Sequence, residues 1–389
     1  MYLALLAVLY LAFISLGLPD SLLGAGWPAM HLALGVPVSY MGLVAMIISG
    51  GTVISSLLSD RLTRKCGTRA VVIVSVFLTA AALLGFSLST KYVHLLLLAV
   101  PYGFGAGAID AAINNYVALH YTSRHMSWLH CFWGVGAIIS PFVMRASLTH
   151  AAWNDGYRIV GFLQLGICAV LLATLPLWKV NKSAAATGAQ SVGVAGALKI
   201  RGVATMLTGF FAYCALEATT MYWASTYLVE AKGTTPERAA GFASLFYIGI
   251  TTGRFLCGFV ANRLGDRRMI RLGTCVLGGG ILLLFASYAV PSLALAGLIV
   301  IGFGCAPVYP SVIHSTPDNF GQENSGAIIG IQMASAYIGT TFMPPLFGLL
   351  GHLTTFEVLP VFLTAFTVLM IVMLERTFGV TAKARGAKA

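Results

Sequence analysis

The sequence contains few charged residues for its length. Asp, Glu, Lys and Arg make up only 9% of its 389 residues, whereas apolar residues make up 58% and the mean hydropathy is +0.88. Soluble proteins carry about 25% charged residues, and soluble cores stop growing beyond roughly 250–300 residues. The composition therefore excludes a soluble enzyme, a disordered chain and a secreted disulfide scaffold, and it predicts a membrane protein.

Acidic residues are the scarcer of the two charge types. The sequence has 12 Asp and Glu against 23 Lys and Arg, a formal net charge of +11. The basic residues gather in every second predicted loop, for example at 61–69 and 263–271, as they do in cytoplasmic loops. The pattern predicts that both termini are cytoplasmic. It also predicts that the positive charge orients the chain in a lipid bilayer and does not bind nucleic acid.

The sequence also lacks common enzyme motifs. It has no G-x-x-x-x-G-K-[ST] nucleotide loop and no H-E-x-x-H zinc motif, and its seven cysteines form no C-x-x-C pair. We therefore expect a protein that is not an enzyme, with no cofactor, no bound metal and no ATP site. Any work across the membrane must then draw on ion or solute gradients.

What the sequence has is long apolar runs, which indicate membrane-spanning helices of about 20 residues and not the alternating segments of a β-barrel. An Ala-, Gly- and Ser-rich stretch over 181–199 predicts a flexible cytoplasmic linker. We predict an all-α membrane protein with a six-helix bundle over 1–180 and a second six-helix bundle with a short basic tail over 200–389. The twelve predicted spans are 2–33, 38–59, 69–89, 92–121, 127–148, 157–178, 202–229, 236–262, 269–289, 292–315, 324–350 and 355–375.

An internal repeat supports the division into two halves. Residues 59–62 (SDRL) recur as 261–264 (ANRL), and 103–105 (GFG) recur as 302–304, both about 200 residues later. Duplicated bundles related by an axis along the membrane normal are a transporter architecture. A third pair at nearly the same spacing is 140–142 (SPF) and 344–346 (PPL).

Two of these segments resemble the loop signature of the major facilitator superfamily. Residues 59–67 (SDRLTRKCG) lie where that signature joins spans two and three, with Ser55 or Ser56 in place of its leading glycine, and 258–268 (GFVANRLGDRR) is the fuller copy. The resemblance implies two six-helix bundles that work by alternating access. It also implies a multi-pass protein of the cell inner (plasma) membrane, which we expect to act as a monomer.

Four further segments resemble the fucose permease family of sugar:cation symporters. They are 17–20 (GLPD), 110–114 (DAAIN), 213–217 (YCALE) and 253–255 (GRF). The resemblance implies symport of a sugar with a cation. The residues between these segments differ enough that fucose itself is not implied.

Three acids lie inside predicted spans and far from any predicted loop: Asp20, Asp110 and Glu217. Each costs roughly 2.5–3.5 kcal/mol at a helix centre, so each needs a partner, water or a proton. We predict that they couple transport to protons or another cation. The alternative is that they are structural acids with hydrogen-bonded neighbours, or, for Asp20, a solvated group near the outer surface.

Amide and aromatic side chains inside the spans are the candidates for binding a hydroxylated solute. Amides bond hydroxyl groups, and aromatic faces cover the apolar side of a sugar ring. Packing between helices is the alternative for each of them. The predicted substrate-binding residues are Asn114, Asn115, Trp133, Gln164, Tyr213, Tyr222, Trp223, Tyr309, Gln332 and Tyr337.

A last group is predicted to gate the pathway through ion pairs that break and form. In it, Asp60 is expected to pair with a neighbouring span, Arg254 to latch an inner gate, and His130 to serve as a gate residue or a proton relay. Positive-inside orientation alone is the alternative for the basic loops. The predicted gating residues are Asp60, Arg61, Arg64, Arg254, Arg263 and His130.

Three functions remain open at this point. The first is proton-coupled symport of a sugar or similar polyhydroxylated small solute, with sodium as an alternative cation. The second is a proton-driven exporter of drugs or other small organic compounds, since intramembrane acids also suit cations. The third is a membrane sensor or scaffold that transports nothing.

Overall fold

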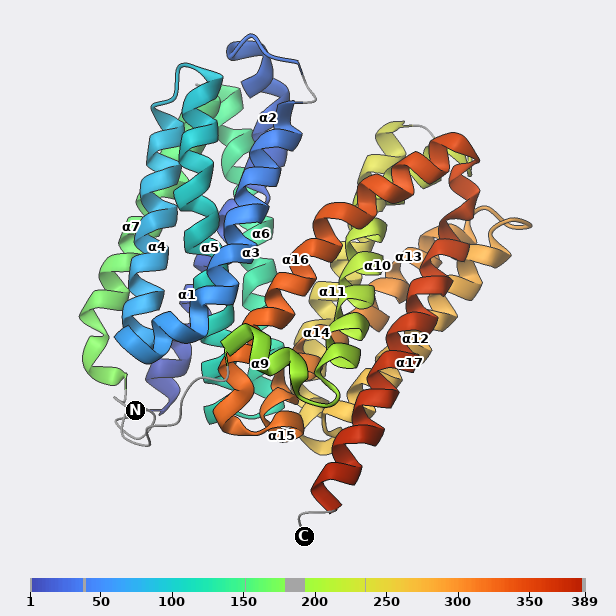
Figure 1. Cartoon of the computed structure of the whole chain (residues 1–389). Coiled ribbons are helices and arrows are strands. Elements are labelled where there is room, and N and C mark those ends of the chain that lie inside the picture. Colours follow the sequence, from blue (N-terminus) through green and yellow to red (C-terminus); the bar gives the residue numbers. More distant parts are fainter. Residues whose placement is uncertain (1, 38–39, 151, 179–192, 235, 387–389) are drawn as a thin grey trace. The chain divides into compact units, whose positions relative to one another are not determined.

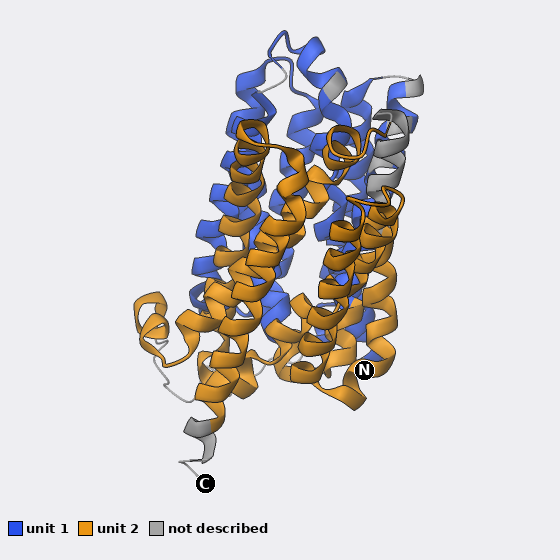
Figure 2. Cartoon of the chain, turned by 90° about the vertical axis from the view of Figure 1, so that its right-hand side faces the viewer, with its two compact units in different colours: residues 1–116, 129–191 blue, residues 117–128, 192–389 orange. Residues whose placement is uncertain are grey.

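The computed structural model describes residues 2–37, 40–150, 152–178, 193–234 and 236–386, and all regular secondary structure within these ranges is helical (Figure 1). The described chain divides into two compact units, coloured in Figure 2. Unit 1 comprises residues 1–116 and 129–191, and unit 2 comprises 117–128 and 192–389.

Unit 1 follows the predicted N-terminal spans. The first span is broken: α1 ends at Asp20, directly after Pro19, and α2 begins at Leu22. Proline removes a backbone donor and clashes with the preceding turn, which accounts for a break near this point. The helices that form unit 1 or enter it are α1 (Tyr2–Asp20), α2 (Leu22–Ala33), α3 (Met41–Cys66), α4 (Thr68–Ser87), α5 (Tyr92–His120), α6 (Ser123–His150), α7 (Trp153–Ala173) and η2 (Leu175–Leu177).

Unit 2 repeats one joint of unit 1. Gly67 (φ 82°) joins α3 to α4, and Gly265 (φ 75°) joins α11 to α12 at the matching place. Glycine adopts positive φ without the steric cost that other residues meet. The helices of unit 2 are α9 (Gly193–Lys199), α10 (Val203–Glu230), α11 (Pro236–Leu264), α12 (Asp266–Ala286), α13 (Leu293–Cys305), α14 (Val308–His314), α15 (Thr316–Phe320), α16 (Gln322–Leu353), η3 (Phe356–Val358) and α17 (Leu359–Gly386).

Among the residues that the structure describes, helices lie in each of the twelve predicted spans, and ten candidate spans are long and apolar enough to cross a membrane. The number rises to eleven if α9 and α10, which are bent by 99° at their junction, form one span. The all-α membrane architecture is therefore confirmed. The remaining predicted span corresponds to α11, which carries Arg254.

The units divide the chain differently from the predicted boundaries at one place. Residues 117–128, which comprise the end of α5, the connection at 121–122 and the start of α6, belong to unit 2, whereas the sequence placed them in the N-terminal bundle. Of the predicted linker at 181–199, residues 181–192 lie outside the described residues. Residues 193–199 form the short helix α9.

Glycines bring helix backbones together at corresponding crossings of the two units. In unit 1, a Cβ at Gly103 of α5 would collide with the carbonyl oxygen of Ile48 on α3. In unit 2, a Cβ at Gly302 of α13 would collide with the carbonyl oxygen of Phe246 on α11. Thr52 Oγ1 donates to the Gly103 carbonyl at 3.2 Å. The glycine face of α5 therefore admits a neighbouring helix.

We expect Gly103→Ala to lower the free energy of unfolding by roughly 1–3 kcal/mol, as overpacking does in well-packed cores. The added methyl group meets backbone and not a flexible side chain. Gly50→Ala on α3 is the matched control, because a Cβ there has open space and alanine favours a helix by about 1 kcal/mol over glycine. Thermal unfolding in detergent compares them, and an equal melting temperature for the two variants would contradict the crossing.

Candidate functional site

Unit 1 contains a buried chain of three polar side chains. Asp110 and Asn114 lie one turn apart on α5, and His130 lies on α6. All three are buried, with Asp110 4% and Asn114 0% exposed. Asn114 Nδ2 donates to Asp110 Oδ1 at 2.8 Å, and His130 Nε2 lies 3.0 Å from Asn114 Oδ1. The predicted coupling acid is therefore joined to the predicted gate histidine through Asn114.

The directions of these hydrogen bonds are fixed by the amide of Asn114. Its Nδ2 also donates to the Asp110 backbone carbonyl at 2.9 Å, so its Oδ1 is the atom that faces His130. Since an amide oxygen only accepts, the Nε2 of His130 carries a hydrogen and donates. Both ends of the Asn114 amide are thus engaged within unit 1.

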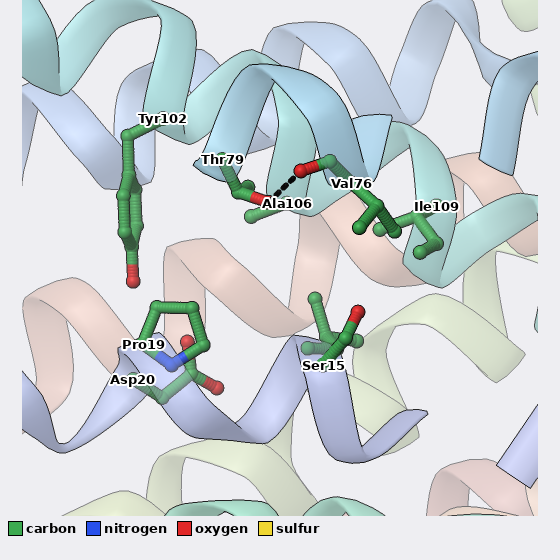
Figure 3. Close-up of a pocket in the computed structure, with 9 residues that line it drawn as sticks. Ser15, Pro19, Asp20, Val76, Thr79, Tyr102, Ala106 and Ile109 are labelled. Atoms are coloured by element: carbon green, nitrogen blue, oxygen red, sulfur yellow. Dashed lines mark hydrogen bonds between the residues drawn. The ribbon is translucent and has the colours of Figure 1, made fainter. Parts of the chain in front are cut away.

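Asp20 lies at the end of α1 and is exposed in the structure. Trp133 Nε1 on α6 donates to its Oδ2 at 2.8 Å. The carboxylate also lines a small cavity with Pro19, Thr79 and Tyr102 (Figure 3). The space left for water there is about 10 Å³, room for about one molecule. In Figure 3 the Tyr102 hydroxyl points toward Pro19 and Asp20.

Unit 2 holds its intramembrane charges as an ion pair. Arg254 Nη2 on α11 donates to Glu217 Oε1 on α10 at 3.1 Å. The two side chains are 5% and 13% exposed. Removing both charges from water is expensive, and good geometry within the pair offsets much of that cost. Glu217 therefore has the fixed cation that a carboxylate inside a membrane requires.

Aromatic groups border this ion pair. The buried Tyr213, one turn before Glu217 on α10, donates to the Cys305 carbonyl at 3.0 Å. The ring centroid of Tyr309 lies 6.2 Å from that of Tyr213, and the Tyr309 hydroxyl donates to Met333 Sδ at 3.3 Å. Three predicted site residues, Tyr213, Tyr309 and Glu217, are thus brought together in unit 2.

Other predicted binding residues are engaged in packing or in structural hydrogen bonds. Trp223 Nε1 donates to the Pro344 carbonyl at 2.8 Å, and its ring stacks on Phe356. Gln332 is fully buried and accepts from Thr316 Oγ1 at 3.0 Å. Tyr222 is 68% exposed. The contacts of Trp223 and Gln332 match the packing alternative, and the role of all three residues in binding stays a prediction.

The remaining predicted binding residues lie elsewhere in the two units. Gln164 on α7 is fully buried and donates through Nε2 to the Ser15 carbonyl, whereas its Oε1 has no hydrogen-bond partner. Asn115 on α5 and Tyr337 on α16 are half-buried. The unpaired oxygen of Gln164 is an acceptor that a solute hydroxyl or a water could satisfy.

The predicted gating residues are dispersed. Asp60 pairs with Arg64 of its own helix at 3.2 Å, and its expected pairing with a neighbouring span stays a prediction. Arg61 and Arg263 are exposed near the ends of α3 and α11. Arg254 pairs with Glu217, as described above.

Sequence reasoning missed a polar cluster at one end of unit 2. Asp266, the first residue of α12, accepts hydrogen bonds from Ser123 and contacts His314 of α14. The three residues are far apart in the chain. The sequence feature that could have pointed to this cluster is Asp266 itself, an acid within the second loop signature. It directly follows Gly265, which has a positive φ in the structure.

Two helical units, each with charged side chains inside long apolar helices, are typical of a membrane transporter. A model of the Major Facilitator Superfamily matches residues 9–245 and 205–389, and the chain therefore belongs to this family. It is thus a multi-pass membrane protein and a secondary transporter, not an enzyme. The family resemblance found in the sequence is confirmed.

The solved structure of the transporter FucP in its outward conformation is similar to this chain, with a TM-score of 0.79 and 18% identity over 95% of this chain and 98% of FucP. FucP is the fucose:proton symporter of E. coli. The glucose/mannose transporter GlcP of Bacillus subtilis is 22% identical over 65% of each chain. The hexuronate transporter of B. subtilis is 23% identical over 87% of this chain and 86% of its own length.

Proposed function

We propose that this protein is a proton-coupled symporter of a sugar or similar polyhydroxylated small solute. The observation that carries the proposal is the buried chain from Asp110 through Asn114 to His130 in unit 1. A carboxyl group with 4% exposure can lose its charge only by taking a proton, and intramembrane acids with partners mark ion pathways in transporters.

Protonation of Asp110 changes the bonds that this chain can make. The ionised carboxylate is an acceptor for the Asn114 amide, whereas the protonated group is a weaker acceptor and gains a donor. Because Asn114 also accepts from His130, a proton on Asp110 alters the hydrogen bonding of both neighbours. The ionised and the protonated form of Asp110 thereby favour different local arrangements of α5 and α6. A proton on Asp110 can then shift the population from one conformer of the protein to the other.

The ion pair of unit 2 offers a second proton-dependent element. A proton on Glu217 would leave Arg254 without its carboxylate, and arginine cannot lose its own charge. The pair therefore resists protonation until another anion or hydrogen-bond acceptor approaches Arg254. Binding of such a group and protonation of Glu217 would then favour one another.

The comparisons support polyhydroxylated solutes as the class to test first. Fucose, glucose and mannose appear in the names of FucP and GlcP, and a hexuronate adds a carboxylate to the same kind of molecule. Arg254 favours the hexuronate type as a second candidate, because guanidinium binds carboxylates in a bidentate manner.

Uptake by proteoliposomes tests this function. We expect labelled solute from a panel of glucose, mannose, fucose and glucuronate to accumulate only when the outside is more acidic than the inside. Replacing sodium by choline at constant pH separates the two cations. Efflux of lipophilic cations with no uptake of any sugar would favour the exporter, and no counterflow of any solute would exclude transport of this panel.

A further inference from the structure

The end of α5, the start of α6 and the short connection between them make several polar contacts with the other helices of unit 2. Arg124 donates through its backbone N to Asn262 Oδ1 at 3.0 Å and through Nε to the Gly258 carbonyl at 3.1 Å. Trp128 Nε1 donates to the Phe255 carbonyl at 3.2 Å. We call residues 117–128 the docked segment. Its neighbours on both sides belong to unit 1, so the chain crosses into unit 2 and returns within twelve residues.

His314 also contacts the docked segment, and both of its ring nitrogens face oxygen atoms. His314 Nδ1 lies 2.7 Å from Asp266 Oδ2, and His314 Nε2 lies 3.0 Å from the backbone carbonyl of Tyr121 in the docked segment. The other carboxylate oxygen of Asp266 accepts from Ser123 Oγ, also in the docked segment, at 2.5 Å. His314 and Asp266 are both mostly buried.

The number of hydrogens in this cluster determines which of its hydrogen bonds can form together. A backbone carbonyl and an ionised carboxylate only accept, and a neutral imidazole has one N–H. A neutral His314 beside an ionised Asp266 could therefore make one of its two bonds, with a lone pair facing oxygen at the other. All the bonds form together only if the His314–Asp266 pair holds one additional proton, as imidazolium or as a protonated carboxyl group.

Based on this geometry, we infer that His314 and Asp266 form a second proton-binding site, whose occupancy holds the docked segment on unit 2. Docking and proton binding favour one another, since the bond to the Tyr121 carbonyl is complete only with the proton in place. Histidine near its ordinary pKa of about 6.5 changes charge in the physiological range. The site is separate from Asp20, Asp110 and Glu217, and its test requires no solute.

Other charged groups lie near the site, and Arg267 lines one hollow with Asp266 and Asp318. Asp318 belongs to α15, the helix that directly follows His314 in the chain. Arg124 and His125 lie in the docked segment, where Arg124 covers the Trp128 ring and the His125 ring contacts those of Tyr121 and Trp128. Because His125 also titrates, it must be tested beside His314.

This proton site bears on the movement by which one bundle rocks against the other in this family. Any state in which the docked segment leaves unit 2 must break the bonds to His314 and Asp266. Loss of the proton lowers the cost of this step. We therefore expect the equilibrium between the docked and released segment to shift toward release by as much as about tenfold per pH unit, within the range where the site titrates.

Hydrogen–deuterium exchange on the full-length protein in nanodiscs measures this equilibrium. Amides of residues 117–128 are followed at about pH 6 and pH 8, and each rate is divided by the intrinsic rate of the unfolded segment at that pH. In the wild type we expect the protection of this segment to fall at least severalfold at the higher pH. Equal protection at the two pH values would overturn the proposal.

Asp266→Asn gives the sharper comparison. An amide in that position can donate to a neutral His314 Nδ1 and still accept from Ser123, while His314 Nε2 donates to the Tyr121 carbonyl. All bonds then form without the additional proton, so we expect protection at pH 8 to stay high. Protection that falls in Asp266→Asn as it does in the wild type would overturn the assignment.

Two histidine variants complete the test. His314→Gln is expected to remove the pH dependence, since its amide can donate to the Tyr121 carbonyl at any pH. His125→Gln is the control, and it should retain the dependence of the wild type. If the pH dependence of protection were lost in His125→Gln and retained in His314→Gln, the proton would bind at His125 and the assignment to His314 would be wrong. None of these readouts depends on uptake, so they are independent of the proposed symport.

Discussion

Asp110→Asn is expected to abolish proton-driven accumulation of the solute while leaving exchange of solute across the membrane. One pH unit is worth 1.36 kcal/mol per proton. A carrier that moves one proton with each solute should therefore accumulate it about 100-fold across a gradient of two pH units. The variant should reach only the external concentration, because an amide cannot take the proton.

The substitution preserves the local structure, which makes the result interpretable. Asparagine at this position keeps an oxygen that can accept from the Asn114 amide. Asp155→Asn on α7 is the matched control, since that carboxylate forms a more exposed ion pair with Arg158. Accumulation near 100-fold in Asp110→Asn would contradict the role of Asp110, whereas equal losses in both variants would indicate a general defect.

Glu217→Gln is expected to destabilise the protein more than Arg254→Gln. Breaking a buried ion pair by removing one partner costs roughly 3–5 kcal/mol, because an uncompensated buried charge is left behind. Without Glu217, the arginine cannot shed its charge. Without Arg254, the carboxyl group can take a proton and become neutral. The two variants therefore leave unequal penalties although they break the same 3.1 Å contact.

The pH dependence follows from the same asymmetry. In Arg254→Gln the folded protein binds a proton that the unfolded chain releases more easily, so its melting temperature should rise as the pH falls from about 8 to 5.5. The melting temperature of Glu217→Gln should lack this rise. The double variant, which buries no charge at this place, should regain most of the lost stability. Equal melting temperatures for wild type and Glu217→Gln would contradict the buried pair.

The sequence predicted the helical architecture and the intramembrane charges because both are local signals. Long apolar runs identify spans without knowledge of their partners, and an acid such as Glu217 within a run is conspicuous. The first predicted span, 2–33, is broken between α1 and α2 in the structure, next to Pro19.

The sequence could not show which side chains meet. Glu217 and Arg254 are 37 residues apart, and Ser123 and Asp266 are 143 residues apart. Such pairs depend on how helices pack, for which the sequence pattern gives no distance. For the same reason the pattern could not distinguish Trp223, which packs on Phe356, from an aromatic group facing a solute.

Proton movement during solute flow tests the proposed coupling most directly. Proteoliposomes with a pH indicator inside and little buffer receive solute on the outside, with no pH gradient at the start. We predict that entering solute acidifies the interior in the wild type and that Asp110→Asn shows no acidification while solute still enters. Solute entry without acidification in the wild type would contradict proton symport.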